Sequence, residues 1–270
     1  MVLAAFEILA ICELIFFFPA FLVSIAVVYK HGAGKRLGWR FLVMISLFRV
    51  VGAICAIVIV ESPSSGVTIT YDIMNNFGLS AIIYTALGLL GRVGAGMEAH
   101  GLPFQLFRVL GLPGLAGLVL SIVGATNLLG DNSSNTSQGF AELKAAVLLF
   151  LAVYVADILI TMHAFFKAAH VRAGERRLLY AVSATLPFMA VRMIYSILCV
   201  FANKPKYFSS WNLEWTAILV HGLMGVLMEV IIVTIFIIVG LLTAAVVRRP
   251  APVRNGKISP PPYEMTDGSA

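Results

Sequence analysis

Charged side chains inside long apolar runs are the residues of this sequence that could do chemistry. Arg49, Asp157, Arg192 and Glu229 each interrupt a run that is otherwise almost uncharged, and Glu13 lies nearer the end of another run. A charge at bilayer depth costs about 3 kcal/mol on insertion scales, so each one needs a partner or water. The four deepest charges are two of each sign. We therefore expect a nearly neutral charged seam, buried inside a membrane protein.

The residues around Arg192 indicate which face of its helix is polar. Tyr195 and Ser196 follow Arg192 at three and four residues, so the three side chains share one helical face. His221 stands eight residues before Glu229, roughly on one face of another helix. We consider two interpretations of His221, a residue of a ligand pocket or an interfacial histidine whose hydrogen bonds are satisfied.

The charges inside the apolar runs allow several pairings. We expect Arg192 to pair with Asp157 or Glu229, and the other acid or Glu13 to lie near Arg49. Such pairs can serve only to lock a helix bundle together, or they can form a ligand or proton site. The sequence leaves both interpretations open.

Several chemistries lack the residues that they need. No lysine occurs between residues 216 and 247, so the last run cannot carry a retinal Schiff base. Four of the five histidines lie at or beyond one end of the runs, which leaves His221 without a facing haem ligand. No His-Glu-x-x-His pattern accompanies Asp157, His163 and His170, and no nucleotide-binding loop is present. We expect no enzyme activity, no cofactor and no metal.

Membrane helices are the elements that must position these side chains. The 270 residues are 60% hydrophobic and 12% charged, against roughly 25% charged residues in soluble domains. An apolar run of about 20 residues crosses the hydrocarbon layer as a helix. The sequence has seven such runs, at residues 8–29, 41–60, 77–96, 109–129, 145–166, 178–202 and 216–247. It predicts an all-α seven-helix transmembrane bundle over residues 1–247, in contact with the lipid bilayer, and a disordered tail over residues 248–270.

The basic residues predict the orientation of this bundle. Fourteen Lys and Arg residues flank one set of alternate loops and three flank the other set, which puts the first set in the cytosol and the N-terminus outside. Two N-glycosylation sequons, at Asn132 and Asn135, fall in a loop predicted to lie outside. The net charge of +6 comes from these short clusters, a membrane pattern that does not indicate nucleic acid. We expect an integral protein of the plasma membrane or of the secretory endomembranes.

The tail contains the sequence Pro260-Pro261-Pro262-Tyr263, which fits the Pro-Pro-x-Tyr motif of WW-domain ligands. Consecutive prolines favour a polyproline II conformation, so docking into an aromatic groove orders little additional chain. A WW-domain protein of the ubiquitin-ligase class is the expected partner.

Three segments resemble those of a family of fungal seven-span integral membrane proteins of unknown function. They are AICELIFFFPAFLVSIAVVYKHG, RLGWRFLVMISLFRVVGAI and RMIYSIL, and the residues that match are Glu13, Arg49, Gly52, Arg192, Tyr195 and Ser196. The layout is also similar to that of G-protein-coupled receptors and of fungal lipid-translocation and resistance proteins. However, no Asp-Arg-Tyr closes the third run and no Asn-Pro-x-x-Tyr closes the seventh. These layouts imply a fold and no activity.

Three classes of function remain. The first is a receptor or sensor with a polar pocket for a small-molecule ligand. The second is a transporter or lipid translocator that uses the charged seam as a relay. The third is a structural membrane protein whose tail recruits WW-domain partners.

Overall fold

The computed structural model describes residues 2–31, 38–62, 64–97, 103–129, 136–167, 171, 173–202, 207–208, 214–243, 246–248 and 263–265. Six long helices are continuous: α1 (Val2–His31), α2 (Gly38–Glu61), α3 (Ser65–Gly96), α4 (Phe104–Leu129), α5 (Thr136–Phe166) and α6 (Ala173–Phe201). The seventh consists of α7 (Trp215–Val220), the π-helical segment η4 (His221–Val226) and α8 (Leu227–Leu242). Two short strands follow, β1 (Val246–Arg248) and β2 (Tyr263–Met265), and they pair antiparallel.

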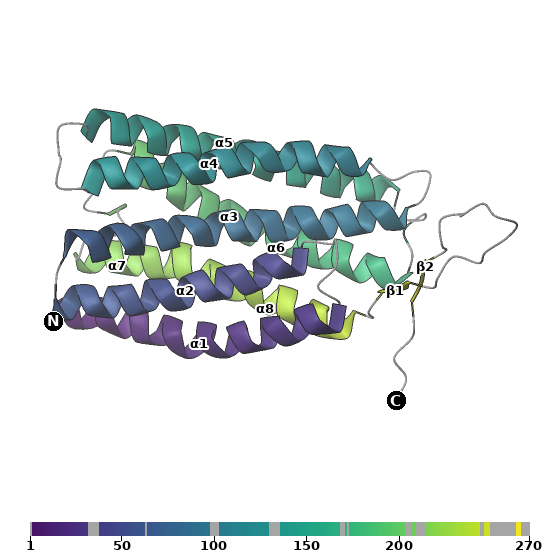
Figure 1. The fold of residues 1–270 in the computed structure, drawn as a ribbon, viewed down its shortest axis with the longest axis horizontal. Helices are drawn as coiled ribbons and strands as arrows, with labels where there is room; N and C mark the ends of the chain where they lie inside the picture. Colours follow the sequence, from purple (N-terminus) through teal and green to yellow (C-terminus); the bar gives the residue numbers. More distant parts are fainter. Residues whose placement is uncertain are drawn as a thin grey trace, which may run out of the picture.

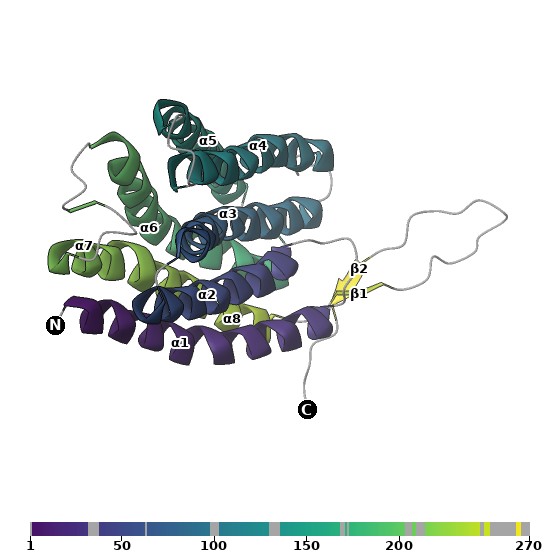
Figure 2. The ribbon, with the colours of Figure 1, turned by 60° about the vertical axis from the view of Figure 1, so that its left-hand side comes forward.

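The helices lie side by side along the long axis of the molecule, with the N-terminus and β1 at opposite ends (Figure 1). In Figure 2 the helices are foreshortened, and α3 lies between α2 on one side and α4 and α5 on the other, with α6 beside it. Burial agrees with this view, because 72% of the most apolar stretch of α3 is buried, against 22–44% for the other six. The central helix α3 is therefore the element against which the other helices place their polar side chains.

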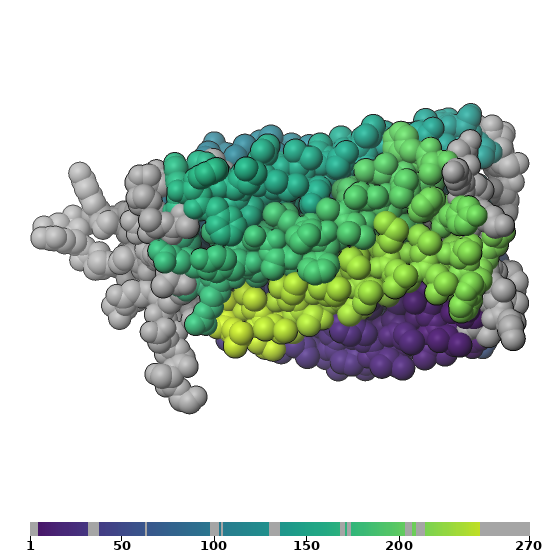
Figure 3. All heavy atoms as spheres, turned by 180° about the vertical axis from the view of Figure 1, so that it is seen from behind, coloured from purple at the N-terminus to yellow at the C-terminus, as the bar shows by residue number. Residues whose placement is uncertain are grey.

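Large apolar side chains cover the outside of the bundle. Ile8, Ile15 and Leu159 are each more than half exposed, although they lie inside long helices. Figure 3 shows one broad face of this surface, which is formed by α5, α6, α8 and α1. Contiguous apolar surface of this extent suits lipid rather than water. Seven helices are long and apolar enough to cross a membrane, so the chain is a multi-pass integral membrane protein.

The seven predicted runs are confirmed, and the first six helices are longer than their runs. The largest difference is in α3, which begins at Ser65 rather than at residue 77. Its first three turns carry Thr68, Thr70, Tyr71 and Asn75, so hydropathy alone does not reveal them. The fourth helix is continuous although it contains Pro113.

The last helix ends earlier than predicted, at Leu242 rather than at residue 247. Three basic side chains from α1 and α6 donate to its final carbonyl groups. His31 Nε2 lies 2.8 Å from the carbonyl oxygen of Gly240, Arg177 Nη1 donates to Leu242 at 3.2 Å, and Lys30 Nζ donates to Leu241. Basic groups at a helix C-terminus satisfy carbonyls that lack intrahelical partners and interact favourably with the helix dipole.

The disordered tail is not confirmed. Tyr263–Met265 pair with Val246–Arg248, so part of the tail forms a short β-ladder. Pro260 and Pro261 of the predicted WW motif lie outside the described residues, and so do the sequon residues Asn132 and Asn135.

Candidate functional site

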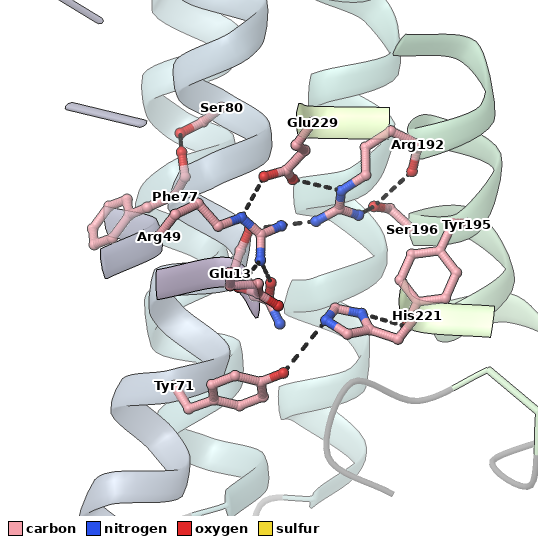
Figure 4. Close-up of polar contacts among 11 residues, drawn as sticks. Glu13, Arg49, Tyr71, Phe77, Ser80, Arg192, Tyr195, Ser196, His221 and Glu229 are labelled. Atoms are coloured by element: carbon pink, nitrogen blue, oxygen red, sulfur yellow. Dashed lines mark hydrogen bonds and ion pairs between the residues drawn. The ribbon is translucent and has the colours of Figure 1, made fainter. Parts of the chain in front are cut away.

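Glu229 on α8 binds two arginines from two different helices. Its Oε2 accepts a hydrogen bond from Nε of Arg49 on α2, and its Oε1 accepts one from Nε of Arg192 on α6 at 2.8 Å (Figure 4). Glu229 is fully buried, and both arginines are 3% exposed. One carboxylate therefore joins three helices by charge-assisted hydrogen bonds, which are roughly twice as strong as neutral ones.

Arg49 reaches two further helices through Nη1. Its Nη1 donates to Oδ1 of Asn75 on α3 at 2.8 Å and lies 3.4 Å from Oε2 of Glu13 on α1. Its Nη2 is buried and has no acceptor among the residues that the structure describes. Arg49 therefore has one buried NH2 group that an added acceptor could bind.

Arg192 also connects two helices. Its Nη1 donates to Oγ of Ser196 one turn further along α6 at 2.8 Å, and its Nη2 donates to the main-chain oxygen of Asn75 at 3.4 Å. We use the term charged network for Glu13, Arg49, Asn75, Arg192, Ser196 and Glu229. Its two acids and two arginines cancel in charge, as the sequence predicts for buried charges.

A glycine on α3 makes room for this arrangement. A Cβ atom on Gly78 would lie 3.3 Å from Oε2 of Glu229 and 3.4 Å from Nε of Arg49. These distances are tighter than ordinary van der Waals contacts, so a larger side chain would push into the ion pair. The absent side chain of Gly78 therefore allows α2 and α8 to meet across α3.

His221 connects a tyrosine of α3 with a tyrosine of α6, next to the charged network. Its Nδ1 lies 3.1 Å from the hydroxyl of Tyr195 and its Nε2 lies 3.4 Å from the hydroxyl of Tyr71 (Figure 4). In either neutral tautomer one ring nitrogen donates and the other accepts, so both hydroxyls have a partner. His221 begins the π-helical segment η4, a geometry that occurs often at functional sites.

Asp157 is not part of the charged network, so the prediction that it belongs to the buried seam is wrong. Of the two acids predicted as partners of Arg192, Glu229 is the one that pairs with it. The hydroxyl of Tyr154 donates to the main-chain oxygen of Leu186 at 3.0 Å, and this bond sets the register of antiparallel helices α5 and α6. Asp157 lies nearly one turn from Tyr154 towards the C-terminal end of α5. Arg192 lies about 9 Å from Leu186 towards the opposite end of the bundle. Both carboxylate oxygens of Asp157 are buried and have no hydrogen-bond partner among the described residues.

Sequence reasoning missed three residues of α3 that complete the site: Tyr71, Asn75 and Gly78. Their spacing of four and three residues places them on one helical face. Two of them precede residue 77, where the third apolar run was predicted to begin. A search for polar residues at helical spacing upstream of that run would have found Tyr71 and Asn75.

A further ion pair, outside the charged network, lies at the end of the bundle where α3 ends and α6 begins. Nε of Arg92 donates to Oε1 of Glu175 at 3.1 Å, and its Nη1 lies 3.3 Å from Nδ1 of His31. This pair joins α1, α3 and α6 near one membrane boundary, whereas the charged network joins them further inside. Among the described residues, no three His, Cys, Asp or Glu side chains come together as a metal site would require.

Comparisons with known proteins place this site in an uncharacterised family. No curated protein and no solved structure matches the chain. The family described as "Domain of unknown function (DUF7702)" matches residues 3–246, which include all seven long helices and every residue of the charged network. The chain therefore belongs to the DUF7702 family.

Proposed function

We propose that this protein is a membrane receptor or sensor in which a small molecule binds at Arg49. The observation that carries the proposal is the buried Nη2 of Arg49, which has no acceptor in the described part of the chain. Every other side-chain nitrogen of Arg49 already binds an acceptor. A ligand with a carbonyl or carboxylate oxygen would supply the acceptor that is missing and would relieve the penalty of a buried donor that has no partner.

Binding at Arg49 would be coupled to helix packing. A ligand acceptor at Nη2 would bind the same guanidinium group that Glu229 holds through Nε, and the other oxygen of Glu229 holds Arg192. A shift of Arg49 towards the ligand therefore changes the contacts of α2, α6 and α8 together. A ligand changes a conformational equilibrium only through such a difference in contacts between two states. The π-helical segment η4 precedes Glu229 in the seventh helix and offers a place where that helix can adjust.

Double electron–electron resonance between two spin labels tests this proposal. Tyr29 on α1 and Tyr180 on α6 are 82% and 59% exposed, so labelled cysteines fit at both positions. The three native cysteines are replaced by alanine first. We expect two distance populations, and we expect their ratio to shift in Arg192→Leu/Glu229→Leu, which leaves Arg49 paired with Glu13. A single unshifted population would instead favour a static lock.

A matched control removes one charge of each sign away from the charged network. Arg40 and Glu61 lie at opposite ends of α2 and both are exposed. The variant Arg40→Gln/Glu61→Gln should leave the distance distribution of the wild type unchanged. A shift in this control equal to that of the network variant would contradict a role specific to the network.

Asp157 favours a second candidate function, a proton-coupled transporter. A fully buried carboxyl group without a hydrogen-bond partner in the described residues is costly in a membrane and typical of proton pathways. Proteoliposomes that contain a pH-sensitive dye provide the test. A transporter predicts a proton flux that Asp157→Asn abolishes and Glu61→Gln preserves, and equal dye signals for all three proteins would contradict it.

A further inference from the structure

An apolar groove lies between α2, α3 and α4. It encloses about 330 Å³ and is lined by Phe41, Tyr84, Gly91, Phe107 and Leu115, among others. Leu112 and Leu115 of its wall are more than half exposed, so the groove opens on the lipid-facing surface of the bundle. The groove is separate from the charged network, so a ligand bound in it would be independent of the proposed function.

Three glycines line the groove, Gly88 and Gly91 on α3 and Gly111 on α4, and we call them the glycine floor. A Cβ on Gly91 would meet only the ring of Phe107, at an ordinary contact distance of 3.5 Å, so helix packing does not require glycine there. The hydroxyl of Tyr84 donates to the main-chain oxygen of Gly111 at 2.6 Å. The one polar atom of Tyr84 is thus used within the protein, and an apolar chain can lie along this floor.

Two arginines stand at one end of the groove. Arg92 and Arg108 both line it, and no acidic residue of the described chain does. Arg92 contacts Glu175 and His31, whereas Arg108 is exposed near the start of α4. Guanidinium groups carry five donors each and suit phosphate oxygens, even while one donor stays in an ion pair. The groove therefore combines an apolar channel with a positive end.

We propose that this groove binds an anionic glycerophospholipid of the adjacent leaflet. One acyl chain would occupy the glycine floor, and the phosphate would lie at Arg92 and Arg108. The positive end is also where α1 ends and α6 begins, beside the basic residues that the positive-inside rule assigns to the cytosol. Anionic lipids are concentrated in that leaflet, and basic pockets between membrane helices on that side bind anionic head groups.

Native mass spectrometry of the full chain in detergent tests the proposal with two lipids of identical acyl chains. Phosphatidylserine should bind more tightly than phosphatidylcholine. Arg108→Gln should weaken phosphatidylserine binding about fivefold, since an exposed arginine is worth about that factor at an anionic surface. It should weaken phosphatidylcholine binding less, because the choline cation offsets the phosphate charge. Gly91→Leu should weaken both lipids at least fivefold because its side chain fills the floor. Ala95→Leu should also weaken the binding of both lipids, because its side chain fills the positive end of the groove.

Matched controls use residues outside the groove. Arg40→Gln removes an exposed charge from α2 at the end of the bundle where Arg92 and Arg108 lie. Ala116→Leu adds a larger side chain at an exposed position of α4. Both should bind the two lipids as the wild type does. Glycerophosphoserine, which lacks acyl chains, should not displace bound phosphatidylserine. The proposal is overturned by wild-type binding in Arg108→Gln and the two groove-filling variants, by equal affinity for the two lipids, or by displacement with glycerophosphoserine.

Discussion

Gly78 on α3 and Glu229 on α8 are close enough that a Cβ atom on the glycine would stand 3.3 Å from the carboxylate. Substitutions of Gly78 therefore test the packing around the charged network without changing any charge. Gly78→Ala should cost little, because the neighbouring side chains can move by a few tenths of an ångström. Gly78→Val should destabilise the protein by about 1–3 kcal/mol, the usual cost of overpacking.

Thermal unfolding in detergent measures this difference. The matched control is Gly66→Val on an exposed position of the same helix, which carries the same change in helix propensity. If Gly78→Val unfolds at the same temperature as Gly66→Val, the close contact with Glu229 is wrong.

The hydrogen bonds of His221 lead to a second prediction. Tyr71→Phe and Tyr195→Phe each remove one bond and should cost about 1 kcal/mol. His221→Leu should cost more than either, because it removes one hydrogen-bond partner from each of two buried hydroxyls. Tyr180→Phe, at an exposed hydroxyl, is the control and should have no effect. Equal stability of His221→Leu and the wild type would show that the two tyrosines do not depend on this ring.

The sequence predicted the helices well and the partners of the charges less well. The length of an apolar run is enough to identify a membrane helix. The cost of burying a charge is enough to predict that the buried charges of both signs balance. Whether Asp157 or Glu229 pairs with Arg192 depends on the register and rotation of whole helices. Contacts such as the hydrogen bond of Tyr154 to Leu186 show that register here. Hydropathy also hides Asn75, because a polar helical turn in a protein core resembles a loop in sequence.

The predicted orientation can be checked by glycosylation. Asn132 and Asn135 should carry glycans because the positive-inside rule places their loop outside. Treatment with an N-glycosidase should increase the gel mobility of the wild type and leave Asn132→Gln/Asn135→Gln unchanged. Labelling of a C-terminal epitope on intact cells would contradict this orientation.

The Pro-Pro-x-Tyr motif leads to a prediction about turnover. A peptide of residues 255–268 should bind WW domains with an affinity in the micromolar range, and Tyr263→Ala should abolish binding because the tyrosine anchors the proline helix. In cells, Tyr263→Ala should lengthen the half-life of the full chain. The control is Tyr207→Ala, at a half-exposed tyrosine outside the tail. Unchanged half-life and surface level in Tyr263→Ala would leave the motif without this role.

The central claim is that Glu229, and not Asp157, holds Arg192. A double-mutant cycle on unfolding free energies tests it, with Arg192→Leu combined first with Glu229→Leu and then with Asp157→Leu. Removing one partner of a buried pair costs about 3–5 kcal/mol, because the other charge is left unpaired. We therefore expect Arg192→Leu/Glu229→Leu to be more stable than Glu229→Leu alone, and the effects of Arg192→Leu and Asp157→Leu to add. Additive effects at 192 and 229, with coupling between 192 and 157 instead, would contradict the account.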